Sequence, residues 1–571
     1  MIKRVKNVLF KSFSRVGETA LLLAFFTFLS QLLSFFRDRF LAGNVGVGEQ
    51  LDVYYAAFRI PDTIFILTLS LVSLSALLPF LQTELREGKE HARRFLSEVF
   101  TVFSLLVIGI GVFTFFLSPF LVKFLFRGFS PSAVHQTVVL SRIMLLSPLF
   151  LGISAIFSTV VQSAKKFLIY AIAPVFYNLG IIIGILFFYP HWGIRGLAYG
   201  VVLGAILHLA IQYLVVKRES LTPSLTFHIR WKKIFSLIKN SLPRVIALSL
   251  SNIFLLILLS YATRFVEGSV SIFQLSYNLR SVPLSLIGLS YSVASFPILV
   301  RLYQEKSYTS FLQHIFYSLR QIVFWSLPAI TLFIVLRAHI VRVILGTGNF
   351  NWNDTKMTAA SLAILVMSVL AQGINILIIR AYYASGKTWK PFIVLFSSLS
   401  LTLPSLIFML RYFSHHPSFY RWVEFILRAP QSKGVEVLIL SFAYVFWTYL
   451  SLLLFMLFFP KDFSFTKDSL RGIIPWKSFL QSFFASLFLG ITLYFSLHLS
   501  VTLFNQHYTF GLFMHALVSA FFSFLLWFAL LLFWENEDAK IFKESVVRIF
   551  HSFRKKLSKG GVTGDIEISI K

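Results

Sequence analysis

The sequence predicts an all-α integral membrane protein of about fourteen transmembrane helices, arranged as two pseudo-symmetric six-helix lobes followed by two C-terminal helices. Of its 571 residues, 57% are hydrophobic and only 13% are charged, whereas a soluble domain carries about a quarter charged residues. The apolar residues form repeated stretches of roughly 20 residues, the length that a helix needs to cross a hydrocarbon core about 30 Å thick. A spanning helix also satisfies its own backbone hydrogen bonds in lipid.

The apolar stretches lie between charged residues or Pro and Gly. The first stretch, 20–36, follows a basic segment and ends without a small-residue cleavage pattern, so we expect a retained helix rather than a cleaved signal peptide. The expected spans are 20–36, 56–81, 96–122, 134–161, 168–188, 196–216, 241–262, 270–300, 311–336, 358–381, 391–410, 435–459, 476–500 and 508–534.

The charge distribution predicts the orientation of these spans. The chain holds 52 Lys and Arg against 23 Asp and Glu, and the basic residues gather in the N-terminus, in every second loop after it and in the C-terminal tail. By the positive-inside rule, both termini are cytoplasmic. Basic residues spaced in this way indicate membrane topology and no nucleic-acid partner. The basic tail is expected either at an anionic lipid surface or as a topology anchor.

An internal repeat predicts the two lobes. Tyr55 and Pro61 on the second helix recur as Tyr277 and Pro283 on the eighth, and a Ser-x-Lys triplet at 163–165 recurs at 385–387. Both pairs of segments are separated by 222 residues, and six helices lie within this period, so the two copies have the same orientation in the membrane. The predicted parts are an N-lobe at 1–218, a C-lobe at 219–460, two further helices at 461–535 and a basic cytoplasmic tail at 536–571.

Charged side chains at the ends of the spans mark the candidate site. A charge at the bilayer centre costs about 2.5–3.5 kcal/mol on insertion scales, so such residues are expected to face a water-filled cavity. An Arg guanidinium pairs well with phosphate oxygens, so a cationic cavity suits a pyrophosphate-bearing headgroup. The candidate residues are Arg37, Asp38, Asp52, Arg59, Arg264, Glu267 and Arg280.

The residues leave structural alternatives open. Arg37 could pair with Asp52 to pin two helices together, and Arg264 with Glu267 could cap a loop. Pro61 and Pro283 each remove a helical hydrogen bond at matching places in the two lobes, which predicts hinges. The alternative is that both are tolerated membrane prolines.

No pattern in the chain indicates bond-making or bond-breaking chemistry. The sequence contains no Cys, which excludes a disulfide, a thiolate metal site and a thiol nucleophile. It contains no phosphate-binding Gly loop, zinc-ligand helix or nucleophile elbow. We therefore expect a transporter that is not an enzyme and uses no cofactor, with any coupling cation or metal left unidentified.

Six short segments, which follow one another in order through both lobes, carry a family resemblance: SFFRD at 34–38, LDVYYAAFRIP at 51–61, APVFYNLG at 173–180, GIRGLAYG at 193–200, EGSVS at 267–271 and RAYYASGKT at 380–388. In these segments the chain resembles the MurJ (MviN) lipid II flippases of the multidrug/oligosaccharidyl-lipid/polysaccharide exporter superfamily. The resemblance implies fourteen helices, a cationic central cavity that works by alternating access, and a groove for the lipid tail beside the last two helices. It also places Arg37 and Asp52 where the family has cavity residues required for function.

The chain departs from the family pattern in two regions. Gln31 and Phe65-Ile66 stand where the family usually has Arg residues. On the eighth helix, Asn278 and Ser281 stand at the positions of a functional Arg and its acidic partner. Arg280 is shifted by two positions, which turns it about 200° around a helix.

The resemblance predicts transfer of lipid II, a polyprenyl-pyrophosphate-linked peptidoglycan precursor, from the inner to the outer leaflet of the bacterial cytoplasmic membrane. The expected partners are this lipid-linked cell-wall precursor, membrane lipids and cell-wall synthesis proteins. Two alternatives stay open. The first is export of another lipid-linked oligosaccharide or a small molecule, and the second is a transport-inactive scaffold for envelope assembly.

Overall fold

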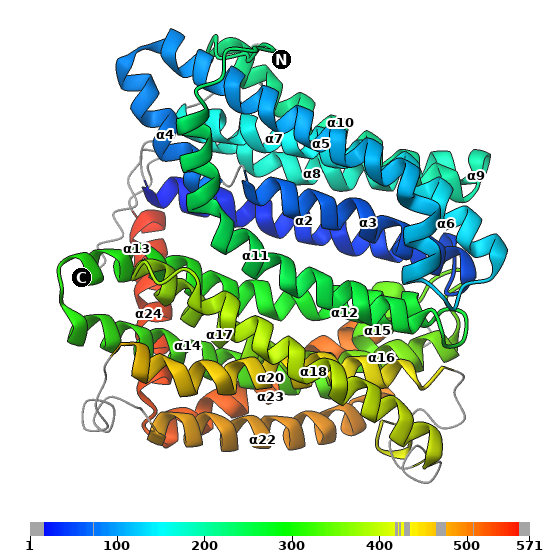
Figure 1. The fold of residues 1–571 in the computed structure, drawn as a ribbon. Helices are drawn as coiled ribbons and strands as arrows, with labels where there is room; N and C mark the ends of the chain where they lie inside the picture. The colour runs from blue at the N-terminus through cyan, green and yellow to red at the C-terminus, as the bar shows by residue number, and fades with distance from the viewer. Residues whose placement is uncertain are drawn as a thin grey trace. The chain divides into compact units, whose positions relative to one another are not determined.

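The computed structural model describes residues 16–71, 74–416, 421, 424–427, 434–463, 476–505 and 508–558. The described residues form helices connected by short turns and contain no strand (Figure 1). The basic N-terminal segment at 1–15 and the end of the predicted tail at 559–571 lie outside the described residues.

The helices in chain order, with three short irregular helical segments labelled η, are α2 (Val16–Asn44), α3 (Glu49–Leu71), α4 (Leu74–Glu87), α5 (Lys89–Leu125), α6 (Pro131–Met144), α7 (Leu146–Ser163), α8 (Phe167–Ile183), η1 (Gly184–Phe188), α9 (Tyr189–Trp192), α10 (Ile194–Arg218), α11 (Trp231–Ala262), α12 (Ser269–Pro283), η2 (Leu284–Leu289), α13 (Ser290–Gln304), α14 (Tyr308–Val335), α15 (Arg337–Leu345), α16 (Trp352–Val366), α17 (Ser368–Ala384), α18 (Lys390–His415), α20 (Val437–Asp462), α22 (Trp476–Leu499), η3 (Val501–Leu503), α23 (Thr509–Phe533) and α24 (Glu537–Ser558).

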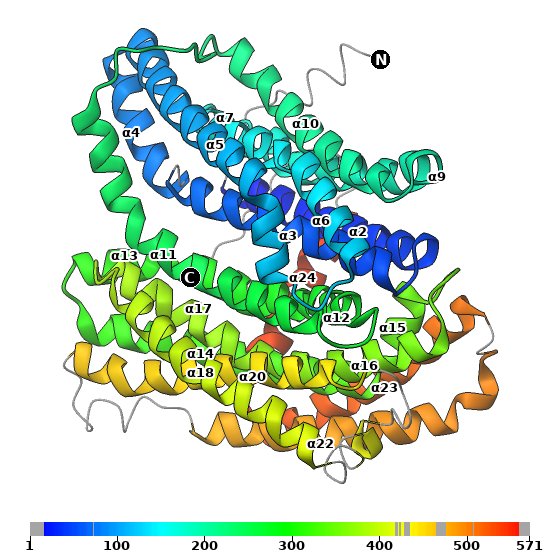
Figure 2. The ribbon, with the colours of Figure 1, turned by 45° about the vertical axis from the view of Figure 1, so that its right-hand side comes forward.

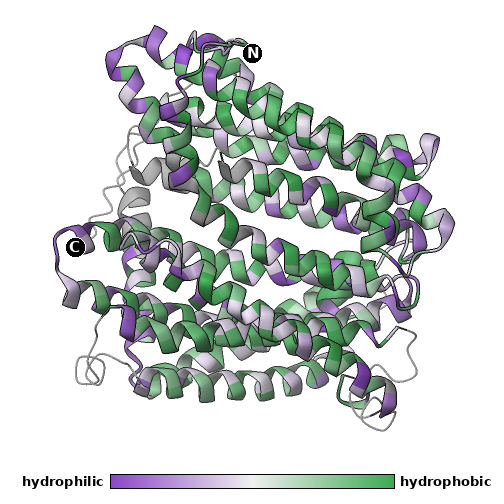
Figure 3. Ribbon diagram, viewed as in Figure 1, coloured by the Kyte–Doolittle hydropathy of each residue, from purple (hydrophilic) through white to green (hydrophobic). Residues whose placement is uncertain are grey.

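Within the described ranges, twelve helical segments are long and apolar enough to cross a membrane. They coincide with the third to the fourteenth expected spans, and hydrophobic residues cover most of their length (Figure 3). The first two expected spans fall on α2 and on α3 with α4, which are not among the twelve. The all-α membrane fold is therefore confirmed, while the count of fourteen spans stays a prediction.

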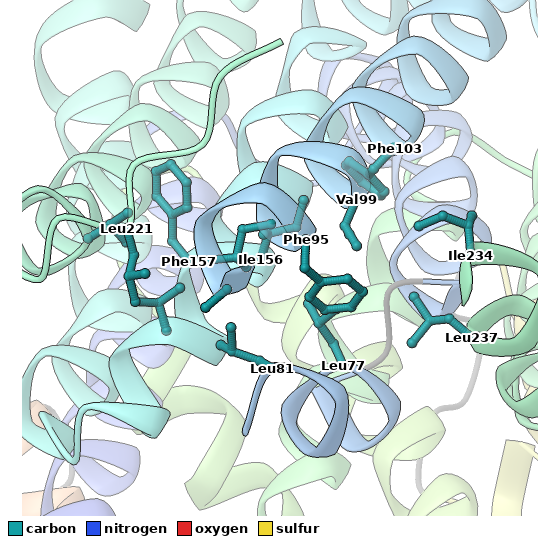
Figure 4. Packing of buried hydrophobic residues seen from close by; sticks show 14 of the residues in the cluster. Leu77, Leu81, Phe95, Val99, Phe103, Ile156, Phe157, Leu221, Ile234 and Leu237 are labelled. Carbon is teal, nitrogen blue, oxygen red and sulfur yellow. The ribbon is translucent and has the colours of Figure 1, made fainter. Parts of the chain in front are cut away.

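The chain packs as two compact units. The first comprises residues 1–276, 344–361 and 388–443, and the second comprises 277–343, 362–387 and 444–571. In the first unit, Leu77, Phe95, Ile156 and Leu237 belong to a buried cluster from α4, α5, α7 and α11 (Figure 4). In the second, a cluster around Trp527 joins α14, α22 and α23.

Two helices break at positions related by the offset of the sequence repeat. The predicted fourth span is interrupted at Leu145, between α6 and α7, and the tenth at Met367, between α16 and α17. These positions are again 222 residues apart. The sequence repeat is therefore accompanied by a repeated break in the helical backbone. Neither Leu nor Met is a residue type that predicts a helix break.

Glycines bring α8 and its continuation η1 into backbone contact with α10 in the first unit (Figure 1). In the same unit, α4 and α5 also pack against each other (Figure 2). A Cβ atom added at Gly184 would lie 2.4 Å from Gly200 Cα, and one added at Gly180 would lie 2.3 Å from Gly204 Cα. Small residues four positions apart allow this close approach. Because the hydrophobic effect does not drive helices together in lipid, membrane helices depend on van der Waals contact of this kind. This pairing fixes the spacing of the helices that carry the cavity described next.

Candidate functional site

A cavity of about 530 Å³ lies among the helices of the first unit. Its lining comes from five helices, α2, α3, α7, α8 and α10. With the orientation predicted from the charges, the part of each helix that lines the cavity lies in the cytoplasmic half of the membrane. The lining residues are Leu23, Thr27, Ser30, Gln31, Phe58, Pro61, Asp62, Phe65, Ser147, Leu151, Ala155, Ser158, Tyr170, Ala171, Pro174, Tyr177, His208 and Gln212.

Among the predicted site residues, Pro61 lines this cavity, and its neighbour Asp62 does as well. Gln31 and Phe65, the two positions at which the chain departs from the family pattern, also line it. The described lining contains no Lys or Arg, so the cationic character expected of the site is not a property of this cavity.

Arg37 and Asp38 form a polar cluster in the last third of α2. The Arg37 guanidinium donates from Nε to Asp38 Oδ1 at 2.9 Å and from Nη1 to Asn178 Oδ1 at 3.2 Å. Asn178 on α8 in turn donates to Ser30 Oγ at 3.2 Å. The Arg37 side chain keeps 20% exposure. Arg37 thus joins α2 to α8, and it does not form the pair with Asp52 that the sequence left open.

Asp52 on α3 caps the N-terminus of α12. Its carboxylate accepts hydrogen bonds from the backbone N–H of Gly268 and of Ser271, both at 2.7 Å, and from Ser271 Oγ at 2.5 Å. The side chain is 3% exposed. The first N–H groups of a helix have no partner within the helix, and its dipole favours a negative charge there. Asp52 therefore acts as a cap that fastens α3 to α12.

Arg59 on α3 is buried and lies one helical turn before Asp62, which lines the cavity. Its Nη1 donates to Asp62 Oδ2 at 3.2 Å, and its Nη2 donates to Gln274 Oε1 on α12. Arg59 thus neutralises the carboxylate that lines the cavity.

Arg264 and Glu267 lie in the connection between α11 and α12, and both are exposed. The Arg264 guanidinium lies 4.6 Å from the ring centroid of Tyr261. An exposed contact of this kind stabilises by about 0.5–1 kcal/mol. The ion pair that the sequence left open between Arg264 and Glu267 does not occur among the salt bridges of the described residues.

Arg280 lies within the second unit and is 1% exposed. Its Nη1 donates to Ser368 Oγ at 2.8 Å and to Gln372 Oε1 at 2.5 Å. The rings of Tyr277 and Tyr444 lie 4.5 and 4.8 Å from the guanidinium carbon. Neutral oxygens and aromatic faces thus hold this cation, and it forms no carboxylate ion pair in the described part of the chain.

The two predicted hinge prolines have different backbone settings. Pro61 lies inside an unbroken α3, whereas α12 ends at Pro283 and continues as the π-helical turn η2. Proline removes a donor from the helical ladder, and single π-helical turns are frequent at functional sites. Their action as hinges stays a prediction.

Sequence reasoning missed the polar pairs that support the cavity wall. Ser154 Oγ contacts His208 Nδ1 at 2.8 Å, and Ser158 Oγ donates to Gln212 Oε1 at 2.7 Å. The two Ser residues are four positions apart on α7, and His208 and Gln212 are four positions apart on α10. This spacing places each pair on one face of its helix. This spacing within two apolar spans was the available signal.

A second polar cluster lies toward the predicted cytoplasmic end of the first unit. Buried Glu84 on α4 and Glu98 on α5 are both bound by Arg230, at 3.3 and 2.8 Å, and Lys233 also donates to Glu84. Glu84, Glu87 and His91 are the one group of described residues with metal-ligand spacing. Because Glu84 already has two cationic partners, this group favours an ion-pair role over a metal site.

The Glu84 cluster predicts a pH-dependent stability. Burial raises the pKa of Glu84, but the hydrogen bond from Lys233 and the charge of Arg230 outweigh it and hold the pKa below its ordinary value of 4.5. A depressed pKa stabilises the fold above pH 4.5, and this contribution is lost as the pH falls through the lower pKa of the folded state. We expect Glu84→Gln to lower the free energy of unfolding by about 2 kcal/mol at neutral pH.

Chemical unfolding of the detergent-solubilised protein between pH 7 and pH 3 measures this contribution. The difference in the free energy of unfolding between wild type and Glu84→Gln should be constant at about one pH unit or more above the ordinary pKa of Glu. It should shrink below pH 4.5. Glu87→Gln on the same helix is the control, because the Glu87 side chain is 52% exposed. A Glu84→Gln difference that does not shrink in acid would contradict the assigned ion pairs.

The family model and the curated relatives name one family. A family model described as lipid II flippase MurJ matches residues 41–416. A probable lipid II flippase MurJ of Rickettsia prowazekii (strain Madrid E) is 26% identical over 396 residues, covering 69% of this chain and 78% of the relative.

Solved structures show the same fold. A lipid II flippase MurJ in an inward closed conformation is 20% identical, with a TM-score of 0.67 and coverage of 92% of this chain and 100% of that structure. An inward-facing multidrug resistance transporter of the MATE family and MOP superfamily is 13% identical, with a TM-score of 0.57 over 76% of this chain and 94% of its own. Since the matched region 41–416 includes well over half of the chain, this protein belongs to the lipid II flippase MurJ family.

Proposed function

We propose that this protein transports lipid II from the inner to the outer leaflet of the bacterial cytoplasmic membrane by alternating access. The observation that carries the proposal is the family match over residues 41–416, which runs through Asp52, Arg59 and Arg280. The buried Arg280 guanidinium, held by neutral oxygens and aromatic rings, adds support, because a cation without a carboxylate pair attracts an anionic headgroup.

The proposal includes an orientation and a set of partners. Both termini face the cytoplasm, as the distribution of Lys and Arg among the loops supports. The partners are the lipid-linked precursor, membrane lipids and cell-wall synthesis proteins. The protein changes the location of its substrate and makes or breaks no covalent bond.

A rescue experiment tests the function. The full chain is expressed in a bacterium depleted of its own lipid II flippase, and growth is followed together with the cleavage of lipid II by an externally added hydrolase. We expect growth and cleavage to be restored. Correct insertion without either of them would overturn the proposed function.

Arg37→Ala tests the cationic site on α2. We expect this variant to lose rescue while it reaches the membrane in near wild-type amount, because Arg37 is part-exposed and Asn178 keeps its hydrogen bond to Ser30. Arg195→Ala, at an exposed position at the start of α10, serves as the control and should rescue fully. Full rescue by Arg37→Ala would remove Arg37 from the site.

A further inference from the structure

The last described helix, α24, crosses the direction of the spanning helices in its unit. In Figure 1, α24 is drawn in red and runs across α14 and α22, which belong to the same compact unit. It begins at Glu537, just after α23 ends at Phe533. Because α23 is the last expected span, α24 lies on the cytoplasmic side in the orientation proposed above. A helix that crosses the spans at their cytoplasmic ends runs along the membrane surface.

Buried polar contacts fix the first turn of α24 to two spanning helices. The Asp538 side chain is 0% exposed, and its Oδ1 lies 2.9 Å from Arg320 Nε on α14. Ser478 Oγ on α22 donates to Asp538 Oδ2 at 2.8 Å. One turn later, the Phe542 ring packs edge-on at 5.0 Å from the ring of Trp325 on α14. These contacts determine where α24 begins and which of its faces is turned toward the spans.

The anchoring contacts lie near the membrane surface. Ser478 belongs to the first turn of α22. Trp476, the first residue of that helix, is 63% exposed, and Trp is enriched at membrane–water interfaces. The 28 residues of α14 make it about 42 Å long, so it extends beyond a hydrocarbon core about 30 Å thick. The first turn of α24 is therefore held near the boundary between hydrocarbon and headgroups.

The sequence of α24 combines an apolar stripe with an excess of basic residues. The apolar residues recur at intervals of three or four, the spacing of one helix face; they are Phe542, Val546, Ile549, Phe553 and Leu557. Between 537 and 558 the helix has six basic residues, Lys540, Lys543, Arg548, Arg554, Lys555 and Lys556, against three acidic ones, Glu537, Asp538 and Glu544. Two of these acidic residues are already paired with Arg320. The rest of the helix is therefore strongly cationic, and its charge is complementary to an anionic surface.

We propose that α24 is an interfacial helix that binds the anionic phospholipids of the cytoplasmic leaflet. Phe542 turns the apolar stripe toward the spanning helices, so the continuation of the stripe faces the acyl chains beside them. The basic residues then lie at the level of the phosphate groups, with which Lys and Arg pair. Through Asp538 and Arg320, the helix ties α14 and α22 to this leaflet. The inference is independent of the transported substrate.

A fluorescent label on the full chain in lipid nanodiscs tests the proposal. Because the sequence contains no Cys, Val546→Cys supplies a single labelling site at a part-exposed position on the stripe. The label is compared in phosphatidylcholine and in an equimolar mixture of phosphatidylcholine and phosphatidylglycerol. We expect brominated acyl chains to quench it only in the mixture, and added salt to reduce this quenching. A label at Glu544→Cys, where the side chain is 71% exposed, should not be quenched.

Charge removal on α24 makes the test specific for anionic lipid. One basic residue near an anionic surface changes affinity by roughly fivefold, so three changes to Gln should weaken binding about a hundredfold and reduce quenching to its value in phosphatidylcholine. The changes are Lys543→Gln, Arg548→Gln and Arg554→Gln. The matched control changes three exposed basic residues at the predicted outer side and should quench as wild type does; they are Lys123, Arg127 and Arg195.

Two results would overturn the proposed lipid site. The first is equal quenching in the two lipid mixtures, or quenching that persists in the triple Gln variant of α24. The second is a Val546→Cys label that is shielded from brominated lipid in both mixtures, because another part of the protein would then cover the stripe. Neither result would affect the rescue experiment, which tests the proposed function separately.

Discussion

Replacing Gly184 with leucine is expected to prevent the first unit from packing. A Cβ at this position would lie 2.4 Å from Gly200 Cα and 3.0 Å from Gly200 N, which are backbone atoms that cannot move aside. Overpacking costs about 1–3 kcal/mol where side chains can adjust and more where they cannot. We expect a loss of about 3 kcal/mol or more in the free energy of unfolding and little folded protein in the membrane.

The effect of Gly184→Leu is measured as the amount of monodisperse protein extracted in mild detergent and as its unfolding temperature. Gly109→Leu is the matched control, because Gly109 lies in an expected span and a Cβ there meets no atom within 4 Å. Gly184→Ala should fall between the two. Normal yield and stability of Gly184→Leu would contradict the close approach of α8 and α10.

Asp52→Ala is expected to destabilise the protein by about 3 kcal/mol and to abolish rescue. The substitution removes the acceptor of three hydrogen bonds and leaves the backbone N–H groups of Gly268 and Ser271 buried without a partner. An unsatisfied buried donor costs about 1–3 kcal/mol. Asp52→Asn retains one acceptor oxygen without the charge, so its stability should be intermediate.

Unfolding measurements and the rescue assay on the same variants separate a capping role from substrate contact. Glu49→Gln, about one turn earlier on α3, is the control, because Glu49 contacts Ser132 only at 3.5 Å. If Asp52 is a cap, loss of rescue should follow loss of stability across the Ala and Asn variants. Loss of rescue in an Asp52→Ala protein of wild-type stability would show that Asp52 instead contacts the substrate.

The residues of the candidate site could be chosen from the sequence, but their partners could not. The charged residues near the span ends have partners on other helices, as Arg37 has in Asn178 and Arg59 in Gln274, and their role toward a substrate stays a prediction. The partners themselves were not predictable, since a helix must be rotated and placed before one knows which side chain it meets. Arg37 and Asp52 do not pair with each other. Arg37 instead binds Asp38 and Asn178, and Asp52 binds the N-terminus of α12.

The amino-acid sequence by itself determined the all-α membrane fold, the third to fourteenth spans and the 222-residue repeat. These follow from hydropathy and residue identity along a continuous stretch, and lipid demands them locally because every backbone polar group must be satisfied within its own helix. Only the tertiary structure decided that Asp52 caps a helix 216 residues away, that Leu145 and Met367 interrupt matching helices, and that Gln31, Asp62 and Gln212 line one cavity. Those contacts depend on close packing between helices, where glycine positions set the distance and helix rotation selects the side chains that meet.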